Sequence, residues 1–193
     1  MINEVYLRLP LSFEPALLRR DLDALLSEGF TPHFNTQYYQ GDWSALPLRS
    51  IEGKIDQIYP DPTKSNFEDT IYLHRSPYFQ EVLATLKATV LSARLLRLGA
   101  GSTIKKHKDY NLGFEDGEVR IHVPIVTNPE IEFILNGDRL TMLPGEAWYL
   151  NVNFDHSVAN PSGEDRIHLV FDCVVNEEIR SLFEIAQTSS GSH

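Results

Sequence analysis

From residue 94 to residue 175 the sequence is a succession of short apolar or alternating segments, and turn signals separate them. Asn136-Gly137, between two of these segments, favours a two-residue β-hairpin turn. Strands this short and this closely spaced favour an antiparallel sandwich or barrel with helices packed outside. We expect a mainly β fold with flanking helices. A double-stranded β-helix (jelly-roll or cupin-like) fits best, because its mouth gathers side chains from distant strands. The expected strands are 94–98, 103–109, 119–126, 131–135, 139–142, 147–152 and 166–175.

The first 93 residues have a different sequence pattern, which predicts helices and irregular segments. Leucines repeat at helical spacing over residues 14–26, and a second apolar stripe covers residues 78–91. Residues 31–69 mix aromatic side chains with Pro, Gly, Asn and Asp, which favours short strands and long loops. At 193 residues and 22.0 kDa, we expect a single domain over 1–193, with this N-terminal part before a jelly-roll core at 94–175.

The overall charge and composition narrow the classes of partner. A formal net charge of −10 disfavours nucleic-acid binding, which needs a field of basic side chains. The sequence has no apolar run of about 20 residues, the length that spans a bilayer, and the segment 1–6 lacks the pattern of a secretory signal. The single cysteine, Cys173, excludes an internal disulfide, suits a reducing cytoplasm, and is expected to fill the core.

His107, Asp109 and His156 are the candidate metal ligands. Two imidazoles and one carboxylate are the set that holds ferrous iron on one face and leaves the other positions open. Residues i and i+2 of a strand share a face, so His107 and Asp109 can reach one metal while Lys108 points away. The third ligand must come from a distant strand that folds back, and His156 is placed for that role.

Two strands carry an unusual polar face. Alternation places Arg120 and His122 on one side of residues 119–126, and Arg166 and His168 share one side of 166–175. Either face could lie in solvent; beside a metal triad, both are better interpreted as walls of an acidic ligand's pocket, since an unpaired buried charge is costly. In contrast, His33 is expected on the surface.

These motifs, taken in order, resemble the aspartyl/asparaginyl β-hydroxylase family and are most similar to its bacterial proline cis-hydroxylases. The resemblance covers about residues 94–175 and depends on the set, since no single motif is specific. The motifs are His107-Lys108-Asp109, Arg120-Ile121-His122-Val123, Gly145–Asn151, Asp155–Asn160 and Arg166–Asp172.

The resemblance implies an Fe(II)- and 2-oxoglutarate-dependent dioxygenase that uses O2 to hydroxylate an unactivated carbon of a free amino acid or related small molecule. It implies that His107, Asp109 and His156 bind iron and that Arg166 holds the distal carboxylate of 2-oxoglutarate. Arg120 and His122 would line the carboxylate site of cosubstrate or substrate.

Three other functions stay open. One is a hydroxylase of a peptide or protein, for which residues 31–69 would line a groove. Another is a noncatalytic cupin-like protein that binds a metal or small ligand. The third is zinc-dependent hydrolysis, which is disfavoured because no further glutamate or histidine is marked as a general base.

Overall fold

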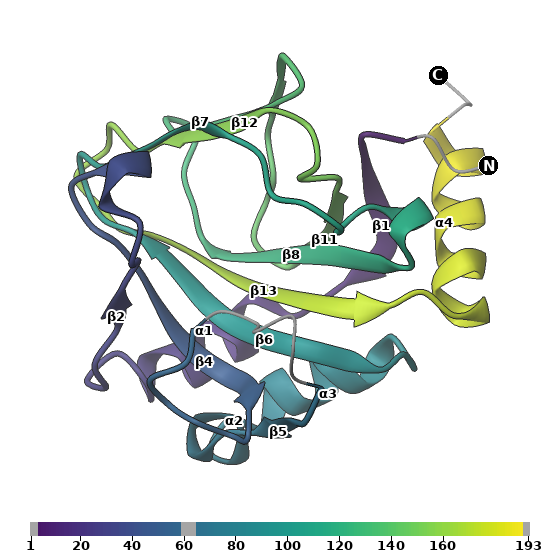
Figure 1. Ribbon diagram of the computed structural model, residues 1–193, viewed down its shortest axis with the longest axis horizontal. Coiled ribbons are helices and arrows are strands. Elements are labelled where there is room, and N and C mark those ends of the chain that lie inside the picture. The colour runs from purple at the N-terminus through teal and green to yellow at the C-terminus, as the bar shows by residue number, and fades with distance from the viewer. Residues whose placement is uncertain (1–3, 59–64, 191–193) are drawn as a thin grey trace.

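The computed structural model describes residues 4–58 and 65–190, which form two antiparallel β-sheets facing each other (Figure 1). The larger sheet has the strand order β1-β11-β8-β13-β6-β4-β2, and β5 pairs with β4 beside it. The smaller sheet has the order β10-β9-β12-β7-β3. Neighbouring strands in both sheets are mostly distant in sequence. This confirms the expected mainly β fold with flanking helices, a double-stranded β-helix.

The strands of the larger sheet are β1 (Tyr6–Ser12), β2 (Thr31–Pro32), β4 (Trp43–Ile51), β5 (Phe67–Asp69), β6 (Val90–Leu98), β8 (Glu118–Val126), β11 (Glu146–Leu150) and β13 (Arg166–Val174). Those of the smaller sheet are β3 (Tyr39–Gln40), β7 (Thr103–His107), β9 (Glu132–Leu135), β10 (Asp138–Leu140) and β12 (His156–Ala159). The α-helices are α1 (Pro15–Asp23), α2 (Ile71–His74), α3 (Pro77–Thr85) and α4 (Glu177–Ser190), and two 3-10 turns are η1 (Thr36–Tyr38) and η2 (Phe114–Asp116).

The two faces of the larger sheet have different roles. Helices α1 and α3 lie on its outer side (Figure 1). Apolar side chains of the sheet such as Ile121 belong to one cluster with helix side chains such as Leu22 and Phe79. Its inner face looks toward the smaller sheet, and a second apolar cluster, which includes Phe133 and Leu135, fills part of the space between them. The helices therefore stabilise the sheet from outside and leave its inner face for polar side chains.

Each expected strand has a counterpart, and the predicted hairpin is confirmed. Asn136 and Gly137 have φ values of 51° and 95°, and they join β9 to β10 with Leu135 opposite Asp138. Positive φ at both central residues is the requirement of a type I′ turn, which explains the Asn-Gly dipeptide. The backbone conformation of two residues thus sets the register of this edge hairpin.

The first 93 residues contribute more to the sheets than the sequence analysis expected. β1 forms one edge of the larger sheet, and β4 lies between β6 and the short strands β2 and β5. Pro47 interrupts the pattern of β4, and the pairing with β6 shifts register between Pro47 and Arg49. Proline in a strand lacks a ladder donor and is typical of such irregularities, so this segment resembles a loop in sequence. The expected loop region also includes residues 59–64, which lie outside the described residues, as do residues 1–3 of the N-terminal segment.

The helices differ from the expectation in two ways. The second helix ends at Thr85, and residues from Val90 onward belong to β6. Lys87 has a φ of 48°, a left-handed conformation that a helix cannot continue through. The sequence analysis also missed α4, the longest helix, which lies beside β1 (Figure 1). In the part of the chain that the structure describes, no helix has the length and apolar character needed to cross a bilayer.

The packing of α1 makes a testable prediction about stability. Leu22 is fully buried against the outer face, whereas Leu26, after the helix end, has 41% of its surface exposed. Leu22→Ala leaves a cavity and is expected to lower the free energy of unfolding by about 2–5 kcal/mol. Leu26→Ala is the matched control and should change it by about 0.5 kcal/mol or less. Urea unfolding measures both, and equal effects would show that α1 does not anchor this core.

Candidate metal centre

The antiparallel pairing of β7 with β12 sets His107 directly opposite His156. β7 ends at His107, so the expected strand to residue 109 is wrong. Asp109 is instead held beside the strand end by its N–H, which donates to the carbonyl of Val152 at 2.9 Å. Lys108 is exposed and is among the residues at the neighbouring cavity. Even so, one ligand atom from each of His107, Asp109 and His156 lies within 4.8 Å of the other two.

The backbone orients both imidazoles in the same way. Nδ1 of His107 lies 2.8 Å from the carbonyl oxygen of Lys105, and Nδ1 of His156 lies 3.0 Å from that of Phe154. A carbonyl only accepts, so each Nδ1 carries the proton and each Nε2 keeps a free lone pair. Nε2 of His107 lies 3.9 Å from Oδ1 of Asp109. These are the tautomers and the spacing that a metal ion needs.

Asp109 belongs to a buried network of charges. Arg120 donates to Oδ2 of Asp109 at 2.5 Å, and it also donates to both carboxylate oxygens of Asp172 at 2.7 and 3.0 Å. Burial alone raises the pKa of the Asp109 carboxyl, but the neighbouring basic groups, of which Arg120 contributes most, together outweigh burial and leave that pKa below its usual value. Asp109 is therefore ionised at neutral pH. One guanidinium positions both carboxylates.

Burial also keeps the imidazole of His156 neutral. It lowers the pKa of His156 to about 4, with the charge of His107 acting in the same direction. A neutral imidazole is the form that binds a metal, so His156 needs no deprotonation near pH 7.

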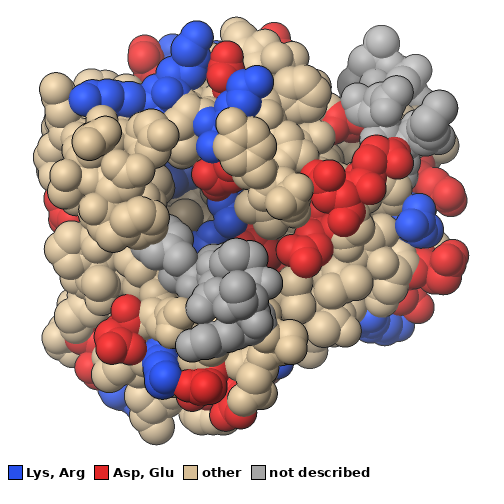
Figure 2. All heavy atoms as spheres, in the orientation of Figure 1, with Lys and Arg blue, Asp and Glu red and all other residues tan. Residues whose placement is uncertain are grey.

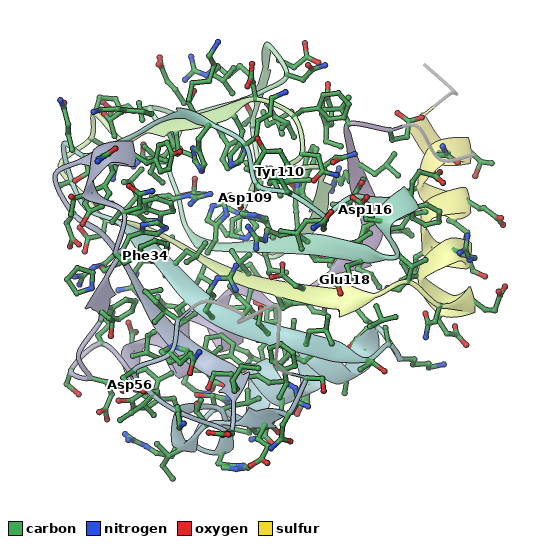
Figure 3. All side chains as sticks on the ribbon, in the orientation of Figure 1. Phe34, Asp56, Asp109, Tyr110, Asp116 and Glu118 are labelled. Carbon is green, nitrogen blue, oxygen red and sulfur yellow. The ribbon has the colours of Figure 1, made fainter. Side chains whose placement is uncertain are left out.

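A cavity of about 310 Å³ opens beside the triad. Figure 2 shows a hollow on this face, with acidic and basic side chains at it, and Figure 3 shows Asp109 in the space between the two sheets. Arg94 and Arg120 line one side of the cavity, from β6 and β8. Aromatic residues also line it, namely Phe34 and Tyr38 from the segment between β2 and β4 and Trp43 from the start of β4. The arrangement combines a metal-ligand set, cationic groups and an aromatic wall.

The structure places the other predicted residues on the inner face. Arg120 and His122 are buried, with 8% and 5% of their surfaces exposed, so the alternative of a solvent face is excluded. Arg166 is also buried, at 3%, but unlike Arg120 it is not among the residues that line the cavity beside Asp109. It lies further along the same face, next to His168 and over the ring of Phe133.

The sequence analysis misplaced His33, assigned no role to Asp172 and left the role of Arg94 open. The expectation that His33 lies on the surface is wrong, because its ring stacks on Trp43 at a centroid distance of 3.6 Å and lines the cavity. The pairing of β2 with β4 brings His33 next to Trp43, because the backbone N–H of His33 continues it by donating to the carbonyl of Trp43. Asp172 was overlooked beside Cys173, although Asp172 shares strand alternation with Arg166. Arg94 reaches the cavity because it pairs with Asp172 from the next strand, at 3.5 Å.

Two imidazoles and a carboxylate converging between the sheets of a double-stranded β-helix define a protein built to bind a metal ion. The profile of the aspartyl/asparaginyl beta-hydroxylase family matches residues 14–175. The chain therefore belongs to that family, which confirms the resemblance seen in the sequence. The match begins within the N-terminal part, well before residue 94, consistent with the strands that this part adds to the larger sheet.

Two relatives agree with this assignment, and a solved structure shares the fold. The chain is 26% identical over 162 residues to L-proline cis-4-hydroxylase of Rhizobium meliloti (strain 1021), covering 83% of this chain and 57% of the relative. It is 28% identical over 141 residues to L-proline cis-3-hydroxylase 2 of a Streptomyces species, covering 70% and 48%. The chain thus spans about half the length of these two relatives. HygX from Streptomyces hygroscopicus, a structure with nickel and 2-oxoglutarate bound, superposes with a TM-score of 0.57 at 12% identity, covering 90% of this chain and 84% of HygX.

The buried histidines predict a pH dependence of stability. Burial lowers the pKa of His33 and of His156 to about 4, and it also lowers the pKa values of His122 and His168. Unfolded histidines titrate near 6.5. Between about pH 6.5 and pH 4 the unfolded chain therefore binds more protons. The stabilisation is fully present above pH 6.5 and decreases as the pH falls, by up to about 1.4 kcal/mol per pH unit for each histidine.

Urea unfolding at several pH values between 7.5 and 4.5 measures this slope. His33→Phe keeps a ring for Trp43 to stack on and removes one titrating group, so it should flatten the slope. His74→Phe changes an exposed histidine and serves as the control. A slope that is the same in His33→Phe and in the unsubstituted protein would contradict the burial argument.

Proposed function

We propose that this chain is a single dioxygenase domain that uses Fe(II), 2-oxoglutarate and O2 to hydroxylate an unactivated carbon of a free amino acid or related small molecule. The observation that carries the proposal is the convergence of His107, Asp109 and His156 within 4.8 Å, beside a cavity lined by arginines. Membership of the family supports it, as do the activities for which the two proline hydroxylase relatives are named.

The residues fit the metal that the proposal requires. Both free Nε2 atoms and the ionised Asp109 carboxylate converge on one point, and two nitrogens with one oxygen suit ferrous iron. When bound, the iron with 2-oxoglutarate would supply the electrons that activate O2 for hydroxylation. Arg120 is bonded to Asp109 and to Asp172, which orients the Asp109 carboxylate before the metal arrives.

Arg166 is the proposed partner of the distal carboxylate of 2-oxoglutarate. Burial lowers the pKa of its guanidinium to about 9, and among the described residues no carboxylate forms an ion pair with it. A buried cation without a counter-charge is unfavourable unless a ligand provides one. On the neighbouring strand β8, His122 lies opposite Val170 and Arg120 lies opposite Asp172, both further along β13 than Arg166. From there they would line the carboxylate site of the cosubstrate or the substrate.

The cavity favours a small substrate with an acidic group. A volume of about 310 Å³ lies at the lower limit of common small-ligand pockets. Arg94 provides a cationic partner inside it, and Lys108 provides another at its exposed edge. The two relatives are named as hydroxylases of L-proline, which supports a free amino acid over a peptide. The buried, reduced Cys173 supports a location in the cytoplasm.

The test of function is a succinate-release screen. The protein is reconstituted with Fe(II) without oxygen and then exposed to air with 2-oxoglutarate and single amino acids or short peptides. A free amino acid that stimulates succinate formation and gains one oxygen atom supports the proposal. Stimulation by peptides alone would favour a peptide hydroxylase. Metal binding without any stimulated turnover would favour a noncatalytic binding protein.

Loss of one imidazole should abolish tight metal binding. His156→Ala is expected to weaken Mn(II) binding, measured by anaerobic calorimetry, by at least 100-fold, more than the roughly 10–100-fold cost of losing an outer-shell partner. His33→Phe changes a histidine of the same cavity outside the triad and should leave Mn(II) binding unchanged. Equal affinities in both variants would remove His156 from the ligand set.

Arg166→Ala should raise the apparent KM for 2-oxoglutarate by at least tenfold, because the variant loses the charge that pairs with the distal carboxylate. Arg97→Ala is the control: Arg97 lies on the outer face of β6, where it pairs with Asp42 at 2.8 Å. Steady-state succinate formation at varied 2-oxoglutarate measures both. Unchanged cosubstrate kinetics in Arg166→Ala would refute its assignment.

A further inference from the structure

Three basic side chains, Arg166, His168 and His122, meet on the inner face of the larger sheet, which we call the Arg166 cluster. Nη2 of Arg166 lies 2.8 Å from Nδ1 of His168, and that nitrogen lies 3.4 Å from Nδ1 of His122. All three are buried, with 3%, 1% and 5% of their surfaces exposed. The sequence analysis assigned roles to Arg166 and His122 but only placed His168 on the same strand face.

The contact with Arg166 determines where His168 carries its proton. Guanidinium nitrogens only donate, so Nδ1 of His168 must accept the hydrogen bond from Arg166. Burial and the charge of Arg166 keep the imidazole neutral by lowering its pKa. Its single proton is therefore on Nε2, and His168 presents Nε2–H as a donor.

That donor has no acceptor. Nε2 of His168 and Nε of Arg166 are both buried and lack any hydrogen-bond partner in the described structure. Buried polar groups are normally satisfied, so two orphan donors on adjacent side chains indicate a missing acceptor. A water molecule would accept a hydrogen bond but leave the charge of Arg166 uncompensated. A carboxylate satisfies both requirements.

The position of the cluster suits a ligand that also reaches the metal centre. On β9, Leu135 lies opposite His156, and Phe133 is two residues further along, a rise of about 7 Å. The guanidinium of Arg166 lies over the Phe133 ring, 5.6 Å from its centroid. A five-carbon dicarboxylate can extend over this length. Of the three cluster residues, His168 lines a second cavity of about 130 Å³ together with Phe133, and this cavity shares no lining residue with the one beside Asp109.

We propose that His168 is a second binding residue for the distal carboxylate of the 2-oxo dicarboxylic acid, donating from Nε2 to one carboxylate oxygen while Arg166 donates to the other. This inference rests on the proposed function and adds to it a residue and a basis for selecting dicarboxylic over monocarboxylic 2-oxo acids.

A pair of matched ligands tests the proposal without turnover. 2-Oxoglutarate and 2-oxopentanoate have the same chain length and the same 2-oxo acid group, but only 2-oxoglutarate has the distal carboxylate. Their dissociation constants are measured by anaerobic calorimetry on the full chain loaded with Mn(II). The unsubstituted protein should prefer 2-oxoglutarate. His168→Leu should weaken 2-oxoglutarate binding by about tenfold, the loss expected for one charge-assisted hydrogen bond, and leave 2-oxopentanoate binding unchanged.

Two variants complete the design. His168→Gln can place an amide N–H near the position of Nε2 and should recover most of the affinity for 2-oxoglutarate, whereas His74→Leu, at an exposed histidine, should have no effect. Retained 2-oxopentanoate binding shows that the variant is folded.

The outcomes separate this proposal from the proposed function. Unchanged 2-oxoglutarate binding in His168→Leu, or an equal loss for both ligands, overturns the role of His168 while the function stands. If the unsubstituted protein binds neither ligand, the proposed function fails and this inference fails with it.

Discussion

The antiparallel pairing of β7 with β12 is the constraint on which the candidate site depends. It sets His107 opposite His156, although 48 residues lie between them in the sequence. Asp109 stays next to the end of β7 through one backbone hydrogen bond to Val152. A register slip of one residue would turn one imidazole to the other face of the sheet. The backbone carbonyls two residues before each histidine then orient its ring. The positions of the two histidines are thus a property of the sheet, whereas Asp109 lies just beyond it, in the segment that follows β7.

The inner face of the larger sheet has an unequal distribution of charge. At one end, Arg120 is balanced by Asp109 and Asp172, so the carboxylate beside the two imidazoles is ionised and oriented. At the other end, Arg166 has imidazoles for neighbours and no counter-charge among the described residues. Burying that cation without an anion opposes folding. The same feature that is costly in the free protein supplies the attraction for an anionic ligand, and a bound dicarboxylate would relieve it.

Residue patterns predicted much of this arrangement. Alternation correctly placed Arg120 and His122 on one buried face, and Asn136-Gly137 correctly predicted a hairpin. The patterns failed where tertiary contacts outweigh local sequence. His33 is polar and lies in a polar segment, yet strand pairing buries it against Trp43. The strand β4 contains Pro47, which obscures its periodicity, and its pairing with β6 supplies the missing signal. The role of Asp172 could not be predicted from its own strand, because it depends on ion pairs with Arg94 and Arg120 from the two flanking strands.

The sequence alone determined the chemical types present: two histidines and an aspartate suited to ferrous iron, arginines at strand spacing, and a succession of short strands typical of a double-stranded β-helix. These follow from local periodicity and side-chain chemistry, which act over a few residues. Only the tertiary structure decided that β7 stops at His107 without losing Asp109, that Arg120 joins two carboxylates, and that Arg166 and His168 share an unmet need for an acceptor. Such properties depend on burial and on neighbours from distant strands, and no local pattern encodes them.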